Sequence, residues 1–163
     1  MKNMSWTDQL DGWCKPRVPG YIGAYPSDVA VTKNLKPGEC MIANYADSKN
    51  DGTENGHWVA ILALPNGSGY FFGSYGKQSW EANELLGTHA RFPTYMEHMF
   101  EGNWTRNTHD YQALNDDTCG HYACWACFTK GPAQNPQAWK MFGHNKKKND
   151  IEIKKLVKLP PHD

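Results

Sequence analysis

The chain has 163 residues, in which 17 acidic residues balance 17 basic ones. This length suits a single domain, 1–163, with a core of useful size, and the charge balance excludes an overall field that would attract nucleic acid or an anionic membrane. No stretch approaches the roughly 20 apolar residues that a membrane span needs, so we expect no membrane partner.

The first half of the chain carries alternating helix and strand signals. We expect a helix at 6–13, a tight aromatic turn at 20–25, a short strand at 29–31 and a strand at 39–45. The apolar runs 58–64 and 70–75 flank a turn of Pro, Asn, Gly and Ser residues, which predicts a β-hairpin.

The second half contains more helix signals. We expect a helix at 80–86 capped by Ser79, a helix after Pro93, a strand within 103–112, a helix from Cys119 to Lys130, a short helix after Pro136 and a last helix that begins after Asn149 or Asp150.

Cys119 lies where a polar loop meets an apolar helical segment. A thiol at a helix N-terminus lies beside unpaired N–H groups and the positive end of the helix dipole, which favour the thiolate. Gly120 lets a substrate carbonyl approach these N–H groups, and Gln112, seven residues before the cysteine, offers an amide donor to the same oxyanion. The alternative is that Cys119 is a small buried hydrophobe.

His57 is the best candidate for the base that a nucleophilic cysteine requires. It follows a loop rich in Asn, Asp and Gly and precedes an apolar strand, so we expect it at the mouth of a buried sheet. The other histidines lie mostly in polar surroundings, for which a surface position is the default.

Three motifs in this order resemble the adenain family of cysteine proteases. They are G-H-W-V-A-I at 56–61, Y-F-F-G-S-Y-G at 70–76, and Gln112 followed by Cys119-Gly120. The resemblance covers roughly 20–130, and it extends to related proteases of large DNA viruses, virophages and mobile elements. A more distant resemblance connects the chain to proteases that process SUMO-like proteins.

The resemblance implies an α+β papain-like fold, with a central mixed or antiparallel sheet and the nucleophile helix packed against it. It implies that Cys119 is the nucleophile, His57 the base and Gln112 the oxyanion donor. The implied function is a viral cysteine endopeptidase that cleaves capsid precursors during virion maturation, at sites that contain glycine. The expected locations are the virion and the interior of the infected cell, and the expected state is a monomer without a cofactor. A deSUMOylase-like or deubiquitinase-like protease is the alternative.

The sequence departs from the family where an acid should orient the histidine, because that position is Gly73. Three interpretations remain open. A backbone carbonyl, a water or Ser74 holds His57 in a Cys-His dyad; a carboxylate such as Glu54 or Glu81 fills the space; or the chain is slow or inactive. The last interpretation leads to a non-catalytic binding module that keeps the protease fold.

Members of the resembled family use DNA and a peptide as activators. Lys146, Lys147 and Lys148 are basic residues that DNA phosphates would contact, although a solvated face is the favoured interpretation. A peptide activator couples through a cysteine, for which Cys14 and Cys40 are the candidates.

The five cysteines suggest two further conclusions. Their odd number and the polar segment 1–13, which does not resemble a signal peptide, favour a reducing compartment, so we expect no secretion. A zinc module is the rival from another class, because four metal-binding residue types fall close together: Cys119, His121, Cys124 and Cys127. On one helix these side chains would point in different directions, which counts against it.

Overall fold

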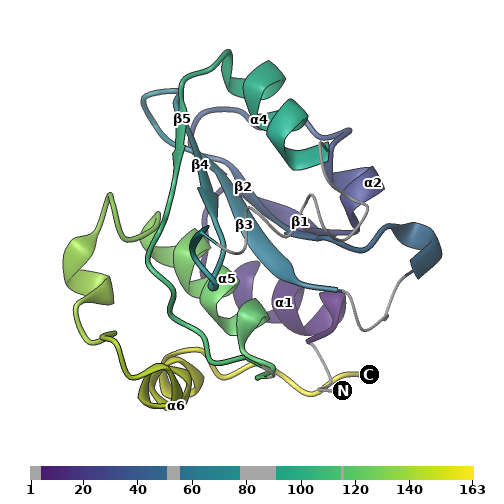
Figure 1. Cartoon of the computed structure of the whole chain (residues 1–163). Helices are drawn as coiled ribbons and strands as arrows, with labels where there is room; N and C mark the ends of the chain where they lie inside the picture. Colours follow the sequence, from purple (N-terminus) through teal and green to yellow (C-terminus); the bar gives the residue numbers. More distant parts are fainter. Residues whose placement is uncertain (1–4, 51–55, 78–90, 115) are drawn as a thin grey trace.

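The computed structural model describes residues 5–50, 56–77, 91–114 and 116–163 (Figure 1). These residues form an α+β fold around a five-stranded mixed sheet. The strands occur in the sheet in chain order: β1 (Tyr21–Tyr25), β2 (Cys40–Asn44), β3 (Trp58–Ala63), β4 (Gly69–Phe72) and β5 (Trp104–Arg106). The outer pairs β1–β2 and β4–β5 are parallel, and the inner pairs are antiparallel.

Helices cover both faces of the sheet. On one face lie α1 (Thr7–Cys14) and α5 (Cys119–Thr129), and on the other lie α2 (Ser27–Ala30) and α4 (Arg91–Phe100) (Figure 1). Along β3, Trp58, Ala60 and Leu62 join the core beneath α5, while the alternate residues join the core beneath α4. A strand buried on both faces has no polar positions, which explains the continuous apolar run.

The predicted hairpin is confirmed. Ala60 pairs with Phe72 and Ala63 with Gly69, and the backbone turns between them at 64–68. Gly69 packs directly against the Phe100 ring. An added Cβ at Gly69 would lie 2.3 Å from that ring, so a side chain there would collide with it. The same register, continued toward the start of β3, sets position 57 opposite position 75.

Two expectations for the N-terminal half are wrong. The segment 20–25 is strand β1 rather than a tight turn, because its parallel pairing with β2 supplies the backbone hydrogen bonds that a turn would have made internally. The segment expected as a strand at 29–31 instead overlaps the helical turn α2, which starts after Pro26 at φ −65°. Its Ser27 and Ala30 side chains are buried.

Two further differences lie in the C-terminal half. Within the segment 103–112, where a strand was expected, only Trp104–Arg106 form one. Beyond it the Asn107 side chain, rather than the backbone of a longer strand, hydrogen-bonds the Gly73 backbone. The last helix, α6 (Lys146–Leu156), begins earlier than expected. Asn145 caps it by accepting a hydrogen bond from the Lys148 N–H at 3.1 Å.

The remaining helical expectations are confirmed within the described residues. Helices α1, α4 and α5 and the short 3₁₀ helix η2 (Pro136–Trp139) lie where the sequence predicted helices, and a second 3₁₀ helix, η1 (Ser48–Asn50), was not expected. The helix expected at 80–86 lies outside the described residues. None of the helices in the described ranges combines the length and apolar character needed to cross a bilayer.

Candidate functional site

Cys119 is the first residue of α5, and its thiol lies against the start of β3. The Trp58 N–H donates to Cys119 Sγ at 3.5 Å, although 61 residues separate them. Helix α5 has no side-chain cap, and the hydroxyl of Thr118, the residue before it, donates to Asp150. The backbone N–H groups of Gly120 and Cys119, at the start of the helix, act on this thiol.

Burial and hydrogen bonding act in opposite directions on the Cys119 thiol. Its side chain is 3% exposed, and this burial raises the pKa of Cys119 to about 11. The backbone N–H groups of Trp58 and Gly120 lower that pKa, but they do not outweigh burial. The expectation of an acidic thiol is therefore not met in the resting structure, because a thiolate loses more hydration here than the N–H groups return.

His57 lies directly before β3, as the sequence predicted, and two tyrosines hold its ring. Tyr75 stacks on the imidazole with a centroid distance of 4.9 Å, and Tyr45 meets it edge-on at 5.1 Å. The His57 side chain is 6% exposed, and burial lowers its pKa to about 3. Burial raises the pKa of the Tyr75 phenol, and the Cys119 thiol adds a smaller contribution in the same direction.

Gln112 is buried between β5 and α5, with its side-chain amide held at both ends. Its Oε1 accepts a short hydrogen bond from Ser74 Oγ, and its Nε2 donates to the Asp116 carbonyl at 3.0 Å. An amide NH₂ has two hydrogens, and within the described residues the second one on Nε2 makes no hydrogen bond.

The segment that follows β4 carries the position at which the resembled family has its acid. Gly73 is fixed by the Asn107 side chain, which accepts from the Gly73 N–H at 2.9 Å and donates to its carbonyl at 2.8 Å. Ser74, one of the groups considered as a partner of His57, donates to Gln112. Glu54 and Glu81, the other candidates, lie outside the described residues.

Asp150 supports the site, a role that we did not predict from the sequence. It lies within α6 rather than at its cap, and its carboxylate accepts from the Thr118 hydroxyl at 3.1 Å, the Tyr122 hydroxyl at 2.8 Å and the Ala113 N–H at 3.1 Å. One carboxylate thus connects the loop before Cys119 with the helix that begins there. Its neighbours along the chain, the polar Asn149 and the apolar Ile151, give no local signal of this role.

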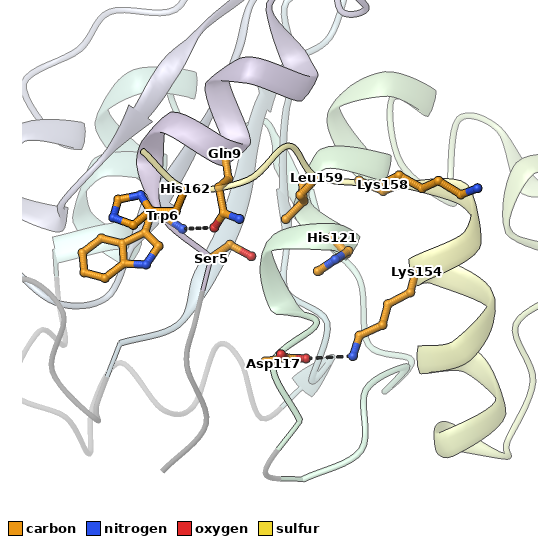
Figure 2. Close-up of a pocket in the computed structure, with 10 residues that line it drawn as sticks. Ser5, Trp6, Gln9, Asp117, His121, Lys154, Lys158, Leu159 and His162 are labelled. Carbon is orange, nitrogen blue, oxygen red and sulfur yellow. Dashed lines mark hydrogen bonds and ion pairs between the residues drawn. The ribbon is translucent and has the colours of Figure 1, made fainter.

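A groove of about 480 Å³ lies beside the first turn of α5 (Figure 2). Asp117 and Lys154 form an ion pair at 3.1 Å on one wall, and His121 lies between them and the C-terminal tail. His121 Nδ1 is buried and has no hydrogen-bond partner among the described residues, and burial lowers the pKa of His121 to about 4. Across the groove, Trp6 stacks on His162 at 4.3 Å.

The N-terminal segment connects this groove to the start of α5 at Cys119. The Ser5 carbonyl accepts from Trp58 Nε1 at 2.9 Å. A Cβ on Gly120 would lie 3.0 Å from Ser5 Oγ and 2.9 Å from Leu10 Cδ2. Gly120 therefore permits a close approach of two chain segments, in addition to any role toward a substrate.

The four other cysteines lie in one core cluster, two of them on α5 itself. Cys124 lies near Cys14 and Cys127 near Cys40, and the Cys127 thiol donates to the Met41 carbonyl at 4.0 Å. The zinc alternative is not supported, because within the described ranges no group of three or more His, Cys, Asp or Glu side chains is arranged to hold a metal ion. Cys14 and Cys40, the candidate sites for coupling a peptide, are both buried.

The basic residues near the C-terminus lie on α6. Lys146 pairs with Asp110 at 2.7 Å, whereas Lys147 and Lys148 are exposed. One of the three lysines considered for DNA is therefore already neutralised by a carboxylate within the chain.

Comparisons with known proteins find likeness to solved structures but no match in sequence. Neither a protein-family model nor a curated protein sequence matches the chain. Among solved structures, the chain is similar to the central domain of the uncharacterized protein Lpg1148 from Legionella pneumophila, with a TM-score of 0.49 and 8% sequence identity. The match covers 96% of this chain and 97% of that one.

Proposed function

We propose that the protein is a cysteine endopeptidase of the adenain-like type, with Cys119 as nucleophile, His57 as base and Gln112 as oxyanion donor. The contact that carries the proposal is the hydrogen bond from the Trp58 N–H to Cys119 Sγ. It brings the residue after the candidate base against the candidate nucleophile, at the uncapped start of a buried helix.

The charge states favour general-base catalysis over a preformed ion pair. With both groups neutral at pH 7, His57 takes the thiol proton as Sγ forms a bond to the substrate carbonyl carbon. The oxyanion is stabilised by the second Nε2 hydrogen of Gln112 and the Cys119 backbone N–H. The imidazolium then protonates the leaving amine as the C–N bond breaks, and water hydrolyses the thioester.

The proposed substrates are polypeptides cut at sites that contain glycine, and the resemblance in sequence favours structural precursors of a virus particle. A glycine near the cleaved bond suits this site because Cys119 and His57 are almost fully buried. A residue without a side chain needs the least space to bring its carbonyl to Sγ.

Hydrolysis of a fluorogenic Gly-Gly peptide amide tests this proposal. We expect turnover that is lost in Cys119→Ala and reduced at least a hundredfold in His57→Ala. Cys124→Ala is the matched control, since it removes a thiol from the same helix away from the site. Turnover that persists in Cys119→Ala would exclude the proposed nucleophile.

A peptide-binding module without catalysis is the second candidate. It is favoured by the burial of both reactive groups and by Gly73 in place of the acid. Absence of turnover in the wild type, together with Gly-Gly peptide binding measured by calorimetry, would select this module over the protease.

A further inference from the structure

An oxyanion donor made from a glutamine amide works in only one orientation. The NH₂ end stabilises negative charge, whereas the carbonyl end repels it. In Gln112 the two ends have different partners: Ser74 Oγ–H donates to Oε1, and the Asp116 carbonyl accepts from Nε2 at 3.0 Å. A flipped amide would set its oxygen against the Asp116 carbonyl oxygen, so the network selects one orientation.

Ser74 is held rigidly where it meets Gln112. Its carbonyl accepts from the Tyr111 N–H at 2.8 Å and from the Gln112 N–H at 3.2 Å. The preceding residue, Gly73, is bonded at both backbone groups by the Asn107 side chain. Ser74 and Gln112 are thus joined through backbone and side chain, and both side chains are at most 1% exposed.

We propose that Ser74 is a positioning residue, whose hydroxyl holds the Gln112 amide with one N–H available to the substrate oxyanion. This inference rests on the proposed function. Without the hydroxyl, Oε1 is a buried acceptor with no donor, which is costly enough for the amide to swing toward another partner. The segment that lacks the orienting acid at Gly73 therefore supports the oxyanion donor through Ser74.

A double-mutant cycle on the full chain separates this role from simple stabilisation. We expect Ser74→Ala to lower kcat on the Gly-Gly peptide amide about tenfold or more, with KM changed less than threefold, because an oxyanion donor acts on the transition state. Gln112→Ala is expected to lose at least as much. In the Gln112→Ala background, Ser74→Ala should change kcat less than twofold, because the amide it positions is gone.

A matched control is available in Ser27, another fully buried serine, whose Oγ accepts from Arg91 at 2.8 Å on the opposite face of the sheet. Ser27→Ala is expected to lower the melting temperature without changing kcat. Equal losses from Ser74→Ala in both backgrounds, or an unchanged kcat in a folded Ser74→Ala variant, would overturn the inference.

A measurement without turnover distinguishes this inference from the proposed function. In the wild type, NMR should show the two Gln112 side-chain N–H signals at shifts that depend on the Ser74 contact, and Ser74→Ala should move these signals while Ser27→Ala leaves them in place. Unchanged signals in Ser74→Ala refute the positioning role even in an active enzyme. If the wild type shows no turnover but Ser74→Ala changes the Gln112 signals as expected, the proposed function is refuted and the contact between Ser74 and Gln112 is established.

Discussion

The pH dependence of thiol alkylation reports the charge state of Cys119. Burial raises the pKa of this thiol to about 11 and lowers that of His57 to about 3, so both groups are neutral at pH 7. A preformed thiolate–imidazolium pair would instead keep the thiolate fraction constant across neutral pH. Alkylation by iodoacetamide distinguishes the two states, since only the thiolate reacts.

The expected rate follows from the ionised fraction. At a pKa of about 11, about one Cys119 thiol in 10⁴ is ionised at pH 7, compared with about 3% of an ordinary cysteine. This roughly 300-fold deficit is offset about tenfold, because a more basic thiolate is more nucleophilic. We expect alkylation at pH 7 to be about 30-fold slower than in a cysteine peptide, before any loss from restricted access.

The assay measures alkylation of each cysteine by mass spectrometry between pH 5 and pH 10, with Cys119→Ala to identify the signal. The rate constant for Cys119 should rise about tenfold per pH unit and show no plateau below pH 10. A rate that is fast and flat between pH 5 and pH 8 would refute the neutral pair. It would mean that the N-terminus of α5 outweighs burial.

Three further changes test other contacts at the site. Because the folded pKa of His57 lies near 3 and the unfolded value near 6.5, the His57 contribution to the free energy of unfolding is complete above pH 6.5 and should fall by up to about 5 kcal/mol as the pH drops toward 3. Urea unfolding at pH 7 and pH 4 should therefore show a smaller loss of stability in His57→Gln than in the wild type. An equal loss would contradict this assignment. Tyr75→Phe keeps the ring that stacks on His57 and should retain kcat within about threefold, whereas Tyr75→Leu removes the ring and should lower kcat at least about tenfold. Equal kcat values in the two variants would show that the ring does not orient His57. Asp150→Ala leaves the Thr118 and Tyr122 hydroxyls and the Ala113 N–H without their acceptor. It should lower the free energy of unfolding in urea by about 3 kcal/mol, more than Asp150→Asn does. A loss below about 1 kcal/mol would be inconsistent with the three hydrogen bonds.

Local sequence signals determined the elements that carry the candidate site. A polar loop followed by a small and then apolar segment predicted the start of α5 at Cys119, and Lys130 ends the helix in the left-handed conformation at φ 69° before Gly131. The hairpin of β3 and β4 followed from two apolar runs around a turn. These signals act within a few residues, so they can be read without knowing the fold.

Contacts between distant segments were not predictable in this way. The segment 20–25 resembled a turn, and only its parallel pairing with β2 made it a strand. The Ser74 bond to Gln112 and the Asp150 bonds to Thr118 and Tyr122 join residues 28 to 38 positions apart. Each partner is an ordinary polar residue until the fold brings the other within reach.

The chemistry of the reactive groups shows the same division. The sequence placed Cys119 at a helix N-terminus and His57 before a strand, which by themselves favour an acidic thiol and an ordinary imidazole. Only the tertiary structure decides how much water reaches them. Because both side chains are almost fully buried, loss of hydration outweighs the helix N–H groups and keeps both neutral.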